Sequence, residues 1–173
     1  MQILIGCGSR RDRLFTPDGK SEWTDLKTLD RNADHKPDIV WDLENVPYPF
    51  EDNSCDEVHA IEVLEHIGDQ GDFRTFFSQF SEFWRILKPG GFLCASCPSL
   101  TSRWLWGDPS HRRVIAPESL TFLIQPQYTR QVGTTPMSDF RDVYKADFDL
   151  VYSDDDEQNF RFILMAVKPS RIT

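Results

Sequence analysis

The stretch Met1-Gln2-Ile3-Leu4-Ile5-Gly6-Cys7-Gly8-Ser9 decides the fold of this chain. Three apolar residues run directly into two glycines separated by one small residue, which is typical of a buried parallel strand that ends in a tight turn. Glycine at positions 6 and 8 lets the backbone adopt positive φ and lets a bound molecule approach without meeting a Cβ atom. The stretch therefore predicts a cradle for a small molecule, although dinucleotides and other adenosine-containing ligands share this pattern.

The second predicted strand, residues 25–30, ends in an acid. Asp30 lies 22 positions after Gly8, close to the offset of about 20 residues at which adenosine-binding folds place a carboxylate on the ribose hydroxyls. This spacing favours an adenosine-containing ligand. The alternative is that Asp30 is a surface acid that caps a turn.

Two further predicted strands also end in acids. Residues 37–43 end at Asp42 and Leu43, where the carboxylate can accept from an adenine amino group and the leucine can pack on the ring. Residues 55–62 end at Glu62. Because ligands bind at the carboxyl ends of the strands in an open α/β sheet, we expect these acids to border one site.

From Asp72 the apolar residues recur at steps of three and four, which predicts a helix with an aromatic face and Asp72 as its N-cap. A strand follows over residues 92–98. Residues 148–152 and 160–167, joined by an acidic turn, predict an antiparallel hairpin. The irregular segment 98–147 is the expected substrate-facing insert or lid, since long segments between strands commonly contact substrates.

The length, composition and net charge of the chain limit the classes of protein to which it can belong. A chain of 173 residues has room for one domain, and 39% hydrophobic residues suffice for a packed core. A formal net charge of −9 disfavours nucleic acid as a partner. We expect no signal peptide, because Met1 opens directly into the first strand, and no membrane span, because no apolar run approaches about 20 residues. These observations predict a cytoplasmic protein of unknown oligomeric state.

Several motifs resemble, in order and spacing, those of class I S-adenosylmethionine-dependent methyltransferases. They are Ile5-Gly6-Cys7-Gly8-Ser9, Leu29-Asp30, Asp42-Leu43, Val63-Leu64-Glu65-His66 and Arg85-Ile86-Leu87-Lys88-Pro89-Gly90-Gly91. The Leu-Glu-His and Leu-Lys-Pro-Gly-Gly motifs are far more specific than the glycine turn, and they disfavour an NAD dehydrogenase. The resemblance implies one α/β domain over residues 1–173, a Rossmann-like three-layer sandwich. Its seven-stranded, mostly parallel sheet would have the order 3-2-1-4-5-7-6, with strand 7 antiparallel.

The resemblance also implies S-adenosyl-L-methionine as cofactor and a set of residues that bind it. These are Gly6, Cys7, Gly8 and Ser9 beside the methionine and ribose, Asp30 at the ribose hydroxyls, Arg31 on one adenine face, Asp42 and Leu43 at the adenine edge, and Ile61 and Glu62 beside the methionyl group and the methyl. The sequence departs from the family at Leu4, where an acid is usual, and at Arg10, where a third glycine is common.

Methyl transfer from a sulfonium is an in-line displacement, so an enzyme aligns the reactants and, for an oxygen nucleophile, accepts a proton. Glu62 and His66 follow the fourth strand and His111 follows the fifth, so we expect His66 or His111 to be the general base. The residues Glu62, Glu65, His66 and His111 also resemble the divalent-metal site of small-RNA 2′-O-methyltransferases and ubiquinone-pathway O-methyltransferases. A base without a metal is favoured over a metal site, and a structural role of the motif is the third alternative.

The sequence therefore predicts a methyltransferase that acts on a small-molecule or glycan acceptor at oxygen. Two alternatives stay open. Arg112 and Arg113 beside His111 would suit an RNA methyltransferase, although the net charge opposes it. Leu4 and Arg10 would suit a catalytically silent module that binds an adenosyl ligand or another protein.

Overall fold

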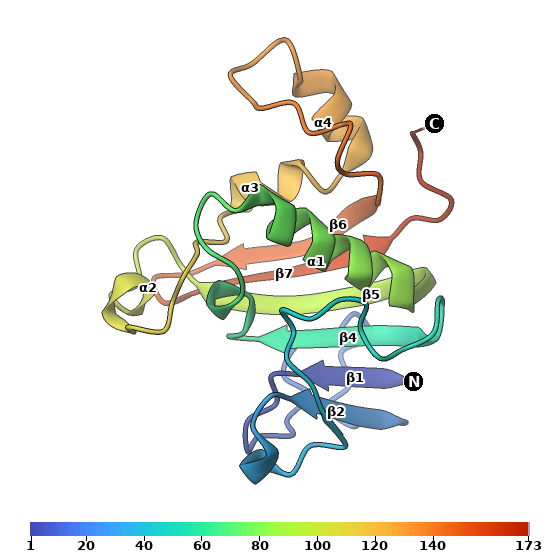
Figure 1. The fold of residues 1–173 in the computed structure, drawn as a ribbon, viewed down its shortest axis with the longest axis vertical. Helices are drawn as coiled ribbons and strands as arrows, with labels where there is room; N and C mark the ends of the chain where they lie inside the picture. Colours follow the sequence, from blue (N-terminus) through green and yellow to red (C-terminus); the bar gives the residue numbers. More distant parts are fainter. Residues whose placement is uncertain (173) are drawn as a thin grey trace.

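A seven-stranded sheet of order β3-β2-β1-β4-β5-β7-β6 dominates the computed structural model, which describes residues 1–172 (Figure 1). The strands are β1 (Gln2–Ile5), β2 (Leu26–Asp30), β3 (Ile39–Val40), β4 (Cys55–Ile61), β5 (Leu87–Pro98), β6 (Phe148–Asp155) and β7 (Asn159–Ala166). Neighbours from β3 to β5 are parallel, and β7 is antiparallel to both β5 and β6. The predicted strand order and the terminal hairpin are confirmed.

The principal helix, α1 (Phe73–Ile86), crosses one face of the sheet (Figure 1). Asp72 caps it as predicted, because its carboxylate accepts from the backbone N–H of Thr75 at 3.1 Å. The buried residues of α1, which include Phe77, Phe80 and Phe83, belong to the main core cluster. The remaining helical elements are η1 (Ala33–His35), η2 (Leu64–His66), α2 (Trp104–Gly107), α3 (Pro117–Thr121) and α4 (Gln125–Gln131). Within residues 1–172, no helix combines the length and apolarity that crossing a membrane requires.

The strands present different residues on their two faces, because successive side chains alternate. Ile3, Val58, Leu93 and Leu164 stand in one row across β1, β4, β5 and β7, and all four belong to the core under α1. The next row along the same strands, Leu4, His59, Cys94 and Ile163, lies on the opposite face. This second face is more polar and needs a different cover.

Residues 9–25 cover that face without forming a helix. The segment is fixed by a buried ion pair in which Arg13 donates to both carboxylate oxygens of Glu57, at 2.6 and 2.8 Å. His59 lies on the same carboxylate at 2.8 Å, and the ring of Trp23 packs edge-on against His59 at 4.8 Å. Irregular chain therefore forms the third layer.

Strand β5 begins at Leu87, five residues earlier than the predicted strand at 92. Leu87 pairs with Cys55, and the register then shifts before Phe92 pairs with Glu57. A Cβ atom on Gly91 would lie 3.0 Å from the backbone oxygen of Asp56. The Lys-Pro-Gly-Gly motif thus follows the end of α1 within β5, and its last glycine lets β5 approach β4 closely.

The segment 98–147 has two parts. Residues 102–111 lie beyond the carboxyl ends of the parallel strands, where α2 projects from the sheet (Figure 1). Farther along, Ile115, Leu120, Leu123 and Tyr144 are buried in the core. The role of the whole segment as a lid remains a prediction.

We expect Glu57→Gln to weaken the fold at neutral pH and to flatten its acid response. Burial alone would raise the pKa of Glu57, but hydrogen bonds from His59 and Arg13 lower it to about 2, from an ordinary value of 4.5. Ionised Glu57 therefore adds about 3 kcal/mol to the free energy of unfolding above pH 4.5, and this contribution is lost as the pH falls toward 2. In urea unfolding at pH 7, 5 and 3, the free energy of unfolding should decline less with falling pH in the variant than in the wild type.

The matched control is Asp18→Asn, because Asp18 is the second acid on Arg13 and is far more exposed. It should leave the midpoint of urea unfolding close to that of the wild type at each pH. An acid decline as steep in Glu57→Gln as in the wild type would contradict the assignment.

Candidate functional site

The glycine turn after β1 has the backbone that its sequence predicts. Gly6 and Gly8 have φ values of 56° and 51°. A Cβ atom on Gly6 would lie 2.5 Å from Cγ2 of Val63, whereas one on Gly8 would meet nothing within 4 Å. Gly6 is therefore required for the packing of the turn against the end of β4, and Gly8 leaves open space beside it. Cys7 between them is buried and Ser9 after them is exposed.

Asp30 at the end of β2 faces the glycine turn. Its carboxylate accepts from the backbone N–H groups of Gly8 and Asn32, both at 2.8 Å, and Nδ1 of His35 lies 3.3 Å away. Burial alone would raise the pKa of Asp30, but these two N–H groups and His35 lower it overall. Asp30 is therefore an ionised acceptor at the turn. It is not a surface acid that caps an unrelated loop.

The chain after β3 lies beside the same edge. The backbone N–H of Trp41 donates to the carbonyl of Asp30 at 3.0 Å, which brings the Asp42-Leu43 pair next to the end of β2. Leu43 is buried in the core, and Asp42 is exposed with one oxygen on the N–H of Glu44 at 3.0 Å. Arg31 is also exposed, and its positive charge helps to lower the pKa of His66.

Arg11 stabilises the turn in a way that the sequence analysis missed. Its guanidinium donates to the carbonyl of Gly8 at 2.9 Å and to the carbonyl of His35 at 3.0 Å. One side chain thus joins the glycine turn to the loop after β2. The sequence holds no short-range indication of this contact, because the two carbonyls lie 3 and 24 positions away.

The end of β4 carries a strained residue. Glu62 has a φ of 53°, which is uncommon for a residue other than glycine and is frequent at functional sites. Its backbone N–H donates to the carbonyl of Ser96, and its carboxylate accepts from the hydroxyl of Ser96 at 2.6 Å. These bonds hold the exposed Glu62 at the junction of β4 and β5. Ile61, the last residue of β4, is half-buried beside it.

Three of the predicted residues converge beyond this junction. Oε1 of Glu65 lies 3.8 Å from Nε2 of His66 and 3.9 Å from Nε2 of His111. The two imidazole rings meet edge-on at 4.7 Å. Nδ1 of His66 contacts the carbonyl of Ser110, and Nδ1 of His111 contacts the carbonyl of Leu105. Because a carbonyl requires a donor, these contacts favour the tautomers whose Nε2 lone pairs face Glu65.

Glu65 is the least satisfied polar group of this cluster. Its side chain is 1% exposed, and neither carboxylate oxygen has a hydrogen-bond partner among the described residues. Burial, with the charge of Glu62 adding to it, raises the pKa of Glu65 to about 8. Burial lowers the pKa of His66. A proton or a cation placed between Glu65 and the two histidines would compensate the buried carboxylate.

The cluster also fits a divalent cation. One ligand atom from each of Glu65, His66 and His111 can be chosen so that all three lie within 4.8 Å of one another. Two imidazole nitrogens and a carboxylate oxygen are typical ligands for a transition metal. The carbonyls on the two Nδ1 atoms are the outer contacts that orient such ligands. Glu62, which the motif suggested as a fourth ligand, does not belong to this group of three.

A cavity of about 360 Å³, here called the strand-end cavity, adjoins the cluster. Its lining includes Glu62, Glu65, His66, Trp104, His111 and Asn159. Sequence reasoning missed Trp104 and Asn159. Trp104 sits on α2 and is 59% exposed, which is unusual for an indole. Asn159 begins β7, and only the pairing of β7 with β5 brings it to this edge.

The fold and the cavity together point to one class of protein. A sheet in this order, with a glycine turn, an ionised acid on β2 and a polar cavity beyond β4 and β5, is the class I methyltransferase architecture. Residues 22–95 match the family described as "Methyltransferase domain". The match and the fold together support a class I S-adenosylmethionine-dependent methyltransferase, with S-adenosylmethionine as its cofactor. No curated protein matches the sequence.

Solved structures share the fold at low sequence identity. A SAM-dependent methyltransferase from Archaeoglobus fulgidus is 15% identical with a TM-score of 0.57, over 95% of this chain and 85% of the other. A chain in a complex between the Haloferax volcanii Trm112 methyltransferase activator and a candidate methyltransferase is 17% identical with a TM-score of 0.57, over 99% of this chain and 83% of the other. The [4+2]-cyclase SpnF is 14% identical with a TM-score of 0.53, over 96% of this chain and 74% of the other. The fold alone therefore does not fix the reaction.

Alanine at the two glycines of the turn should separate backbone strain from packing. Both positions have positive φ, so each substitution costs about 1–2 kcal/mol of stability. Gly6→Ala also forces a Cβ atom against Val63, which adds about 1–3 kcal/mol. We expect Gly6→Ala to be clearly the less stable variant in thermal unfolding. Equal losses, or no recovery when Val63→Ala is added to Gly6→Ala, would contradict the packing argument.

Proposed function

We propose that this protein transfers the methyl group of S-adenosylmethionine to a hydroxyl oxygen of a small-molecule or glycan acceptor bound in the strand-end cavity. The observation that carries the proposal is the position of His66 and His111, whose Nε2 atoms face the buried carboxylate of Glu65 in that cavity. A hydroxyl loses its proton during methyl transfer, so an acceptor for that proton is needed within reach. An imidazole nitrogen with a free lone pair supplies one.

The cofactor would lie over the glycine turn. Gly6 and Gly8 leave the backbone accessible, Asp30 offers its remaining lone pairs to the ribose hydroxyls, and Asp42 is exposed for the adenine edge. Cys7 and Ser9 would flank the methionine part, Arg31 and Leu43 the adenine, and Ile61 and Glu62 the methyl. Acids around the cavity would also favour the cationic sulfonium over its neutral product.

The acceptor would bind between the histidines and α2. Trp104 offers an exposed indole face at the rim, and Gln158 and Asn159 offer amide groups opposite it. An indole packs on the apolar face of a sugar or aromatic ring, while amides and acids hydrogen-bond to hydroxyls. This combination of groups supports a neutral, hydroxyl-bearing ring as acceptor.

A divalent cation held by Glu65, His66 and His111 would bind the acceptor oxygen and lower the pKa of its hydroxyl. Without it, His66 or His111 accepts the proton, and Glu65 stabilises the imidazolium that results. The same residues orient the acceptor in both cases.

The RNA alternative finds less support. Arg112 is paired with Glu44 and Asp69, and Arg113 is buried. Arg112 is therefore paired within the protein, and the burial of Arg113 keeps it from a phosphate on the surface. The silent module remains the alternative in which the cofactor or its product binds and no methyl transfer follows.

Asp30→Ala should weaken the affinity for S-adenosylhomocysteine by about 1–3 kcal/mol, because the ribose hydroxyls lose an acceptor in a partly desolvated site. Isothermal calorimetry measures this loss directly. Asp34→Asn is the matched control, since Asp34 is an exposed acid of the same loop, and its affinity should equal that of the wild type. Unchanged affinity in Asp30→Ala would mean that the ribose lies elsewhere. No heat with the wild type would favour a protein-interaction module.

His111→Ala and His66→Ala should separate binding from transfer. We expect the release of S-adenosylhomocysteine, measured against a panel of sugars, glycosides and phenols, to fall by about 10²–10⁴-fold in the variant that lacks the base. Affinity for S-adenosylmethionine should stay the same in both variants. Full activity in both would refute the assignment. Chelator treatment followed by Mn²⁺ distinguishes the two modes, because only the metal mode loses activity and then recovers it.

A further inference from the structure

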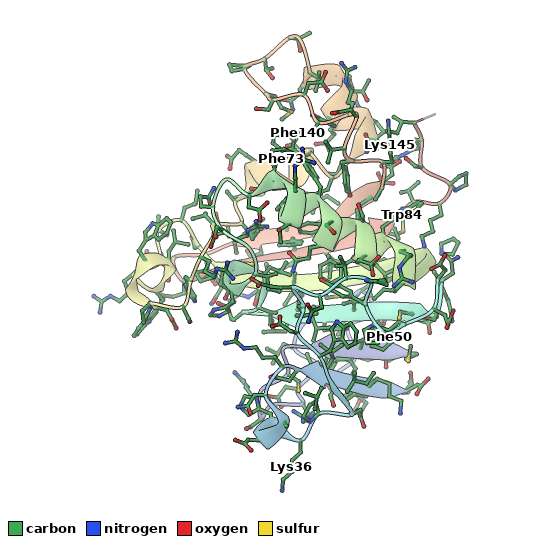
Figure 2. The ribbon with its side chains drawn as sticks, in the orientation of Figure 1. Lys36, Phe50, Phe73, Trp84, Phe140 and Lys145 are labelled. Carbon is green, nitrogen blue, oxygen red and sulfur yellow. The ribbon has the colours of Figure 1, made fainter. Side chains whose placement is uncertain are left out.

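A second cavity lies at the amino-terminal end of α1 and shares no lining residue with the strand-end cavity. It has a volume of about 240 Å³, and its walls include Phe73, Phe76, Phe77, Phe122, Phe140 and Arg113. We call it the phenyl cavity. Figure 2 shows Phe73 of α1 beside Phe140 of the chain before β6, and their rings stack at 4.7 Å.

Arg113 is the one cation among the residues that line this cavity. Arg113 is buried, with 3% of the residue exposed. Nη2 donates to the backbone carbonyls of Asp69 and Asp72, at 3.1 and 2.9 Å, and the guanidinium lies 5.5 Å from the centre of the Phe76 ring. Nη1 has no hydrogen-bond partner within residues 1–172. A buried donor without an acceptor is costly.

Arg113 also lacks a direct ion pair among residues 1–172, and the nearby charges of Asp72 and Asp69 offset only part of the decrease in its pKa that burial causes. No carboxylate of the described chain lies within 4.0 Å of its guanidinium, whereas the neighbouring Arg112 pairs with both Glu44 and Asp69. Asp72 lines the cavity, but its carboxylate is bound to the backbone and hydroxyl of Thr75 as the cap of α1. A buried cation of this kind favours an anionic ligand.

We propose that the phenyl cavity is a second ligand site that takes a small apolar carboxylate, with its hydrocarbon part among the phenylalanines and its carboxylate on Arg113. The size of the cavity agrees with this ligand. An apolar cavity of about 150 Å³ suffices for benzene, so about 240 Å³ holds a ring with a short acidic arm.

The phenyl cavity adjoins the strand-end cavity through the backbone. The N–H groups of Arg112 and Arg113 donate to the carbonyl of Glu65, at 2.8 and 3.1 Å, and His111 precedes them in the chain. A carboxylate on Arg113 thus binds to the segment that carries His111 without occupying the methyl-transfer site. Binding there does not depend on whether the protein transfers methyl groups.

Calorimetry with phenylacetate, phenylacetamide and phenethylamine tests the site. We expect phenylacetate to bind about tenfold or more tightly than the amide, and the amine to give no heat. Arg113→Met should lower the affinity for phenylacetate by about tenfold or more. The matched control Arg112→Met should bind phenylacetate as tightly as the wild type does. Val114→Phe, which fills the cavity and keeps Arg113, should abolish binding. Saturating S-adenosylhomocysteine should leave the phenylacetate affinity within about twofold.

Several results would overturn the proposal. They are no heat with phenylacetate, equal affinity for the acid and the amide, wild-type binding in Val114→Phe, and competition between phenylacetate and S-adenosylhomocysteine. Thermal unfolding of each variant shows whether it is folded. If Arg113→Met does not fold, Val114→Phe and the comparison of the three ligands still decide.

Discussion

The buried pair of Arg13 and Glu57 is the interaction on which the rest of this structure depends. Among residues 1–172 only one long helix, α1, covers the sheet, and it covers one face. The opposite face is closed by residues 9–25, which have no helical hydrogen bonds of their own and are fixed by what they contact. Arg13 fixes this segment to β4, and Arg11 fixes its beginning to the loop after β2. The glycine turn keeps its shape because both ends of the turn are fixed.

Two opposite electrostatic situations are combined at the strand ends. Asp30 is stabilised in its ionised form by backbone N–H groups, so it is a permanent acceptor. Glu65 lies a short distance along the same edge and has no hydrogen-bond donor among the described residues, so its burial favours a proton on its own carboxylate or a cation between it and the two histidines. The first arrangement suits the binding of a nucleoside, and the second suits chemistry on a hydroxyl.

The sequence was sufficient for the features that arise from local pattern. An apolar run that ends in two glycines predicted β1, and apolar runs that end in acids predicted β2 and β4. The aromatic period predicted α1 with Asp72 as its cap, and the family resemblance implied the strand order. The glycine turn and Asp30 also lie together as expected, since the spacing of a strand-turn-strand unit is set by the backbone.

The parts that could not be predicted depend on residues far apart in the chain. Arg13 and Glu57 are 44 positions apart, and nothing near Arg13 indicates a buried partner. Asn159 reaches the strand-end cavity only through the register of β7 on β5. Arg113 looked like an exposed basic residue, but it is buried because the chain that follows His111 turns under α1 toward the core. Such positions follow from the packing of the whole domain.

The two margins of the sheet also affect how copies of this protein meet at high concentration. On one side the outermost strand, β3, has two residues, which is too short to template another chain. On the other side β6 is interrupted by a register shift between Leu150 and Tyr152 and ends in Asp154 and Asp155. A bulge and like charges oppose the addition of a further strand, so crowding should not drive this sheet to grow into fibrils.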